Sequence, residues 1–144
     1  MIVNLYTDGA CKGNPGPGGW GVVIIKNGKP VDEMYGGESN TTNNRMELLA
    51  VIRGLNKIKE ADTVRVNTDS MYVKNGITSW INKWVENGWK TAAKKDVANK
   101  DLWVKLRAIV EVREVTWHWV RGHSGDVGNE RADFLANKGV SDYC

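Results

Sequence analysis

The sequence predicts an α/β fold in which helices flank one mixed sheet of five strands. Three strand-like segments come first, and helix-like and strand-like segments then alternate to the end of the chain. The dipeptide Asn27-Gly28, between the second and third of these segments, is a strong signal for a tight hairpin. This order favours a sheet with both antiparallel and parallel pairs that is covered by helices.

Five segments have the composition of strands: residues 2–8, 20–26, 31–36, 63–68 and 115–120. The Gly/Pro-rich stretch 13–19 predicts a loop between the first two, and the Asn27-Gly28 turn predicts antiparallel pairing of the next two. In the fourth segment Val64 and Val66 alternate with polar residues, which is typical of a strand with one buried face.

Capping residues at 41–44 and an apolar repeat predict a helix that runs to about residue 59. The repeat consists of Leu48, Val51, Ile52, Leu55 and Ile58. Further helices are expected at about residues 70–76, 79–87, 100–111 and 129–138, and the last should end at Gly139. Residues 88–99 and 121–128 show no periodicity and predict irregular segments.

At 144 residues, with 41% apolar and 26% charged residues, the chain predicts one soluble globular domain spanning residues 1–144. No window approaches the roughly 18 consecutive apolar residues of a membrane helix, and the N-terminus has no secretion signal. A cytoplasmic protein is therefore expected. The two cysteines, Cys11 and Cys144, fit neither a disulfide framework nor a zinc site.

The net charge of +3 resides in one segment, residues 80–105, where six lysines stand against three acidic residues. Tryptophans lie in the same segment, and positive charge beside aromatic residues favours a polyanionic partner.

Four carboxylates stand where a buried charge is unfavourable. Asp8 and Asp69 each end a predicted strand, whereas Glu47 and Asp133 lie in the first turn of predicted helices, Glu47 at the rim of the buried stripe. Each alone would be an ordinary solvated group, but strand ends and flanking helices can converge at one edge of an α/β sheet. Carboxylates crowded there would repel by about 4 kcal/mol per pair at ~4 Å and an effective dielectric of ~20. Because divalent cations with oxygen ligands would relieve that repulsion, the pattern predicts a metal-dependent phosphoryl-transfer site.

Four motifs resemble those of a known family. They are Thr7-Asp8-Gly9-Ala10-Cys11-Lys12-Gly13-Asn14-Pro15-Gly16, Thr42-Asn43-Asn44-Arg45-Met46-Glu47-Leu48, Thr68-Asp69-Ser70, and Gly122-His123 followed by Asn129-Glu130-Arg131-Ala132-Asp133. In this order and spacing, and with the tryptophan-rich segment, the chain resembles bacterial ribonuclease H of type 1 over nearly its whole length. The resemblance implies a ribonuclease H-like sheet of order 3-2-1-4-5 in which strand 2 is antiparallel. It also implies one catalytic domain, no separate hybrid-binding domain, and a monomer.

The resemblance further implies an endoribonuclease that cuts the RNA strand of RNA–DNA hybrids without sequence specificity and leaves 5′-phosphate and 3′-hydroxyl ends. Asp8, Glu47, Asp69 and Asp133 would hold two Mg²⁺ ions, or Mn²⁺ ions, at the scissile phosphate, with Asp8 bridging both. Asp133 would complete the site of the ion that activates water, and Glu47 and Asp69 the site of the ion at the leaving 3′ oxygen. His123 would assist proton transfer or product release from a glycine-rich loop; the alternative is an ordinary surface histidine.

Contacts to the RNA strand would lie in the minor groove. Cys11, Asn14, Asn43 and Asn44 resemble the family's residues there, and an asparagine amide can both donate to and accept from a 2′-hydroxyl. The alternative is a structural role, with Asn14 as a turn residue and Asn43 or Asn44 as helix caps.

The DNA strand would lie across the basic, tryptophan-rich segment. Trp80, Trp84 and Trp103 would form a channel that packs on deoxyribose, and Thr42 and Asn99 would hold a DNA phosphate. Tryptophans at this spacing more often pack in a core, so both interpretations stay open.

The chain departs from many bacterial relatives in and around this segment. Trp84-Val85-Glu86-Asn87-Gly88-Trp89 replaces a strongly basic run, and Ala98, Asn40 and Met71 stand where a lysine, an arginine and a polar residue are common. These departures predict retained activity with weaker hybrid binding.

Two other functions fit parts of the sequence. A resolvase, transposase or 3′–5′ exonuclease of the same superfamily would share the carboxylates but not the helix start at residues 43–47 or the tryptophans. A non-catalytic hybrid-binding module would have no use for clustered negative charge beside a phosphate. The stretch 13–19 lacks the Gly-Lys-Ser/Thr ending of a nucleotide-binding P-loop.

Overall fold

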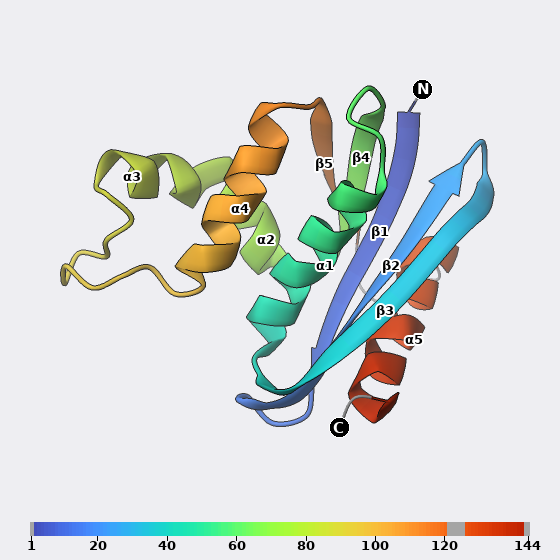
Figure 1. Ribbon diagram of the computed structural model, residues 1–144, viewed down its shortest axis with the longest axis horizontal. Coiled ribbons are helices and arrows are strands. Elements are labelled where there is room, and N and C mark those ends of the chain that lie inside the picture. Colours follow the sequence, from blue (N-terminus) through green and yellow to red (C-terminus); the bar gives the residue numbers. More distant parts are fainter. Residues whose placement is uncertain (1, 121–125, 143–144) are drawn as a thin grey trace.

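Five strands form one mixed sheet of order β3-β2-β1-β4-β5 within residues 2–120 and 126–142, the part of the chain that the computed structural model describes (Figure 1). The strands are β1 (Ile2–Cys11), β2 (Gly16–Lys26), β3 (Lys29–Thr41), β4 (Thr63–Thr68) and β5 (Val115–Trp119). β2 runs antiparallel to β1 and β3, whereas β1 with β4 and β4 with β5 pair in parallel. The predicted strand order and the antiparallel strand 2 are confirmed.

Helices cover both sides of this sheet. They are α1 (Asn43–Lys57), α2 (Met71–Asn75), η1 (Gly76–Trp80, a π-helical turn), α3 (Ile81–Glu86), α4 (Lys100–Glu111) and α5 (Val127–Asp142). α1, α2 and α4 lie on one side, and α5 packs against β1, β2 and β3 on the other (Figure 1). α3 and the segment after it reach away from the sheet. None of the described helices has the length and apolar character needed to cross a membrane.

The main core lies between the sheet and the helices α1 and α4. Its fully buried side chains include Val3, Leu5, Val64, Val66, Leu48, Val51, Leu55, Trp103 and Leu106. A smaller cluster under α5 contains Val23, Ala132 and Leu135. All five apolar residues of the repeat predicted for α1 are buried. At roughly 1.5–3 kcal/mol per buried aliphatic side chain, this packing fixes α1 firmly on the sheet.

Some predicted boundaries are too short. β1 continues three residues beyond the predicted end, because Gly9 to Cys11 still pair with Trp20 to Gly18 of β2. β3 likewise spans residues 29–41 instead of 31–36, and its last residue, Thr41, pairs with Gly16. Pairing with a long neighbouring strand therefore extends both segments past the point where their own composition stops favouring a strand.

Glycines account for the other errors, because three of them provide close packing instead of loops or helix ends. Gly19, predicted in a loop, lies within β2, and a Cβ there would collide with the carbonyl oxygen of Ala136 in α5. Gly139, predicted to end the last helix, lies inside α5, which starts at Val127 and ends at Asp142, and its Cβ would collide with a carbonyl oxygen of β3. Gly76 sits against the Trp103 ring, and the helical path continues through it into η1 and α3 with no break.

Candidate active site

The sheet places Asp8 and Asp69 at the point where β4 ends. β1 pairs with β4 only as far as Tyr6, and Asp8 pairs on its other side with Gly21 of β2. Asp69 follows Thr68, the last residue of β4. The prediction that Asp8 ends its strand is therefore wrong, because β1 continues to Cys11. Asp8 lies just beyond the end of the neighbouring strand β4, where β1 has no strand partner on that side among the described residues.

Helix α1 contributes Glu47, the fifth residue of the helix. Its side chain is only 3% exposed, so it is buried and does not lie at the rim of the apolar stripe as predicted. Oε1 accepts a hydrogen bond of 2.6 Å from the backbone N–H of Gly9. Oε2 is buried and has no hydrogen-bond partner among the described residues. A buried carboxylate oxygen without a donor is costly unless a cation supplies the missing interaction.

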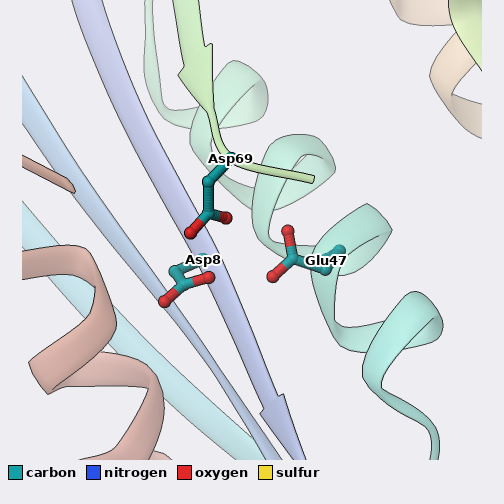
Figure 2. A group of neighbouring side chains, drawn as sticks. All are labelled: Asp8, Glu47 and Asp69. Carbon is teal, nitrogen blue, oxygen red and sulfur yellow. The ribbon is translucent and has the colours of Figure 1, made fainter. Parts of the chain in front are cut away.

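Asp8, Glu47 and Asp69 point toward one another from β1, α1 and the end of β4 (Figure 2). Each offers a carboxylate oxygen, and these three oxygens lie within 4.8 Å of one another. Burial, followed by the nearby charge of Glu47, raises the pKa of Asp8 well above its ordinary value. Burial also raises the pKa of Glu47, and the charge of Asp69 adds to the rise. The cluster thus resists ionisation until a positive charge enters it.

Asp133 reaches the same place from α5. It lines a depression of about 370 Å³ together with the other three carboxylates. Asp133 lies in the second turn of α5 and not in the first, because the helix begins at Val127. Asn137 donates to its backbone oxygen at 2.9 Å and to Oδ1 at 3.4 Å. The structure therefore brings all four predicted carboxylates to one depression, three of them in a tight group.

Two of the four residues expected at the RNA strand line this depression, and a third is hydrogen-bonded to one of them. Asn43 and Asn44 line it, and the backbone N–H of Asn43 donates to Oδ1 of Asn14 at 3.1 Å. Cys11 lies near the end of β1, and its Sγ donates to the backbone oxygen of Gly13 at 2.8 Å. The asparagines are exposed at the start of α1, beside the carboxylates.

The helix cap at this end of α1 is Thr42, whose Oγ1 accepts a hydrogen bond of 3.2 Å from the backbone N–H of Arg45. The capping role considered for Asn43 or Asn44 thus belongs to their neighbour, which leaves both asparagine side chains at the surface.

The tryptophans divide between surface and core. Trp80 is 37% exposed and Trp84 is half-buried, with ring centroids 5.9 Å apart. Trp103 is fully buried and packs against Trp84 at 5.3 Å, so the prediction that Trp103 contacts the substrate is wrong. It lies on the apolar side of α4, and its Nε1 donates to the hydroxyl of Tyr72 at 3.0 Å.

Asn99 precedes α4 and belongs to a polar network. Its Oδ1 accepts from Arg45 at 3.5 Å, and its Nδ2 donates to the Tyr72 hydroxyl at 3.2 Å. Arg45 also forms a bidentate ion pair with Asp101, at 2.9 and 2.6 Å, which lowers the pKa of Asp101. Sequence reasoning did not single out Tyr72 or Asp101. Only the position of Arg45 in the motif at residues 42–48 could have pointed to this network. His123 lies outside the described residues.

Comparison with known proteins agrees with this geometry. The RNase H family model matches residues 1–141. The chain is 59% identical over 140 residues to Ribonuclease H of Rhodospirillum rubrum, covering 97% of this chain and 84% of that protein. It is 58% identical over 143 residues to Ribonuclease HI of Neisseria meningitidis serogroup A, covering 99% and 98%.

The chain belongs to the RNase H family. Among solved structures, LC9-RNase H1, a type 1 RNase H with the type 2 active-site motif, superposes with a TM-score of 0.83 at 35% identity, covering 99% of this chain and 74% of that one. LC11-RNase H1, solved in complex with an RNA/DNA hybrid, superposes with a TM-score of 0.70 at 28% identity and 97% coverage of both chains.

Membership of the RNase H family confirms the predicted resemblance, the fold and the enzyme class. The protein is a nuclease that hydrolyses the RNA strand of RNA–DNA hybrids. RNase H enzymes depend on metal, and the buried triad of Asp8, Glu47 and Asp69 has the oxygen ligands that suit a hard cation. These relatives fit neither the hypothesis of a resolvase, transposase or 3′–5′ exonuclease nor the hypothesis of a non-catalytic hybrid-binding module.

Proposed function

We propose that Asp8, Glu47, Asp69 and Asp133 together hold two Mg²⁺ ions, or Mn²⁺ in their place, while the enzyme cuts the RNA strand. One observation carries the proposal: three carboxylate oxygens converge within 4.8 Å in a setting where Glu47 Oε2 is buried without a partner. When bound, the ions supply an activated water and neutralise the charge that develops on the leaving 3′ oxygen.

The position of each carboxylate suggests which of the two ions it would bind. Glu47, Asp69 and Asp133 all act on the carboxyl group of Asp8, which supports a role for Asp8 as a ligand of both ions. Asp133, from α5, would serve one ion, and Glu47 and Asp69 would serve the other. The hydrogen bond from Gly9 fixes one oxygen of Glu47 and leaves the second oxygen for the ion. Rigid placement on strands and a buried helix lowers the reorganisation needed when substrate binds.

Selection of RNA would come from short polar side chains beside the carboxylates. Asn14, Asn43 and Asn44, with Cys11, are proposed to contact 2′-hydroxyls and sugars of the RNA strand in the minor groove. Support comes from the exposure of the asparagines and from the fact that Thr42 already caps α1. Cleavage at any sequence follows, because none of these contacts reads a base edge in the major groove.

The DNA strand is proposed to pack on Trp80 and Trp84, with one of its phosphates held by Thr42 and Asn99. Trp103 packs against the half-buried Trp84, which in turn packs against Trp80. A deoxyribose can approach an aromatic face where a 2′-hydroxyl would be desolvated, so this surface favours DNA. His123 is proposed to move a proton or assist product release.

The enzyme is further proposed to act as a cytoplasmic monomer. Sedimentation velocity at micromolar concentration should give a single species of about 16 kDa; a dimer that persists on dilution would contradict the monomer.

A substrate panel tests the proposal as a whole. Labelled RNA–DNA hybrid, duplex DNA, duplex RNA and each single strand are incubated with the protein in Mg²⁺, and the products are sized and their ends mapped. Cleavage confined to the RNA strand of the hybrid, with 5′-phosphate and 3′-hydroxyl ends, is expected. Cutting of duplex DNA at a comparable rate would refute it.

A further inference from the structure

Trp119 is an exposed aromatic residue that is bonded to the carboxylate cluster. It is the last residue of β5 and is 40% exposed. Its Nε1 donates a hydrogen bond of 3.3 Å to the backbone oxygen of Asp69, and Asp69 lines the depression. An indole has only this one donor, so the bond fixes the ring beside the cluster and leaves the apolar surface of the ring for a ligand.

A lysine accompanies the Trp119 ring. Lys74 belongs to α2, which packs against β5, and its Nζ lies 5.9 Å from the centre of the ring. Within residues 2–120 and 126–142 no carboxylate forms an ion pair with Lys74. Its positive charge is therefore available to a ligand that also contacts the ring.

A second exposed ring with a cation beside it lacks this available charge. Arg131 of α5 lies 4.8 Å from the centre of the Phe134 ring, which is 54% exposed. Glu33 accepts two hydrogen bonds from the Arg131 guanidinium, at 2.9 and 2.6 Å, and so neutralises it. Lys74 beside Trp119 differs from this pair in its available charge and in the direct bond from its ring to the carboxylate cluster.

The surface around Lys74 continues the wall of the carboxylate depression. Met71, the first residue of α2, lines the depression and is 46% exposed. Residues three apart on a helix lie on the same side of it, so Lys74 follows Met71 along one face of α2. Tyr72 lies on a different side of the helix and packs its ring against Trp80, which is proposed to contact the DNA strand. A strand that runs from the carboxylates past Met71 to Lys74 is therefore the RNA strand.

A paired nucleotide of the RNA strand offers the Trp119 ring little. Its base is stacked within the duplex, and its 2′-hydroxyl would be desolvated against an aromatic surface. An unpaired nucleotide can instead turn its base onto the ring, and such stacking is a main source of affinity in the binding of single strands. A lysine beside the ring suits the phosphate of the same nucleotide.

We propose that Trp119 and Lys74 bind an unpaired nucleotide of the RNA strand at the point where that strand leaves the hybrid. The ring stacks on the base, and the lysine contacts the phosphate. The inference rests on the proposed function, which places the RNA strand at the four carboxylates. It makes a hybrid with an overhanging RNA strand a better ligand than a blunt hybrid. It requires no particular sequence, because every base has a face that can stack.

Binding of a set of hybrids in chelator tests the proposal without cleavage. The hybrids are blunt, or carry a short RNA overhang at the 5′ end, an RNA overhang at the 3′ end, or a DNA overhang. The wild-type protein should bind one of the two RNA-overhang hybrids roughly five- to tenfold more tightly than the blunt hybrid. The same overhang made of abasic nucleotides should lose most of this gain. Equal affinities for all the hybrids, or an equal gain from a DNA overhang, would overturn the proposal.

Variants of the two residues assign the gain, which is read as the ratio of the two affinities, overhang over blunt. Trp119→Ala should bring this ratio close to one, and Lys74→Gln should lower it in a protein that keeps the bond from Trp119 to Asp69. Trp119→Phe loses that bond but keeps a ring, so it should retain much of the gain. Phe134→Ala removes the matched ring on α5 and should leave the ratio unchanged. Thermal melts identify the folded variants, and a wild-type ratio in folded Trp119→Ala or in Lys74→Gln overturns the proposal.

Cleavage of the blunt hybrid by the wild-type protein in Mg²⁺ separates this inference from the proposed function. If the RNA strand of the blunt hybrid is cut and the overhang brings no gain in affinity, this inference alone is overturned. If the hybrid is not cut at all, the proposed function fails with it.

Discussion

The backbone N–H of Gly9 donates a hydrogen bond of 2.6 Å to Oε1 of Glu47 and so joins β1 to α1 one residue beyond Asp8. This bond brings a buried glutamate beside a buried aspartate, and Glu47 Oε2 has no partner among the described residues. The fold therefore maintains an unfavourable charge arrangement that a bound cation can relieve. Function here is obtained at the expense of stability in the metal-free state.

Replacing Asp8 with Asn should raise the stability of the metal-free protein and lower its activity. The amide needs neither the extra proton nor the unfavourable charge that a carboxyl group in this cluster carries at pH 7, so the free energy of unfolding in chelator should rise by about 1–2 kcal/mol. Turnover in Mg²⁺ should fall by roughly a hundredfold or more. Urea unfolding and hybrid cleavage measure the two. Asp32→Asn, at an exposed position of β3, is the matched control and should change neither by much. Lower stability of Asp8→Asn would contradict the charge argument.

The stability of the metal-free protein should depend on pH in a defined direction. The pKa values of Asp8 and Glu47 are raised in the folded state, so the folded protein binds protons more tightly than the unfolded chain. The stability they contribute is therefore fully present below the unfolded values near 4 and is lost as pH rises toward the folded values, by at most about 1.4 kcal/mol per pH unit for each group. Urea unfolding in chelator from pH 5 to 8 should show the decline, and saturating Mg²⁺ should flatten it. A rise over that range would disprove it.

Trp103 should contribute mainly to the stability of the protein, whereas Trp80 should contribute mainly to hybrid binding. Trp103→Ala removes a fully buried ring and should destabilise the protein by about 3–5 kcal/mol. Trp80→Ala removes a ring that is 37% exposed and should weaken hybrid binding while costing much less stability. Thermal melts and hybrid titrations of both variants check this. Comparable stability losses, with no change in affinity for Trp80→Ala, would show that Trp80 is only a core residue.

The low positive charge of α3 should limit hybrid binding. Glu86 lies exposed on this helix, so Glu86→Lys should tighten binding and steepen the dependence of log Kd on log salt by up to ~0.9 for one added phosphate contact. Glu60→Lys makes the same charge change just beyond α1, far along the chain from the tryptophans, and is the control. Identical slopes for both variants would mean that α3 does not meet a phosphate.

The sequence predicted those features that repeat or that cluster in motifs. The apolar repeat of α1 and the boundaries of β4 and α4 carry a local signal, and each is found where its pattern indicates. The four carboxylates line one depression as predicted, although Asp8, Glu47 and Asp133 occupy other positions within their elements than the sequence indicated. Burial of Glu47 could not be foreseen, because its depth depends on β1 crossing close to α1 and not on the helical repeat.

Features that depend on tertiary contact were missed. In the sequence Gly19 and Gly139 resemble a loop residue and a helix end. In the structure the absence of a Cβ at both positions allows α5 to pack closely on the sheet. Trp103 has the same residue type as Trp80, and only the packing of α4 decides which of the two is buried. Tyr72 stands in no motif, and its importance comes from Asn99 and Trp103, which are 27 and 31 residues away in the chain.

Cleavage of a labelled hybrid by the wild-type protein and by Asp69→Asn, each in Mg²⁺, Mn²⁺ or chelator, tests the metal-holding role of the carboxylates most directly. The wild-type protein should cut the RNA strand with either metal and yield no product in chelator. Asp69→Asn should fold normally and cut at least about a hundredfold more slowly with both metals. Near-normal turnover by Asp69→Asn, or cleavage of the hybrid in chelator, would contradict the assignment.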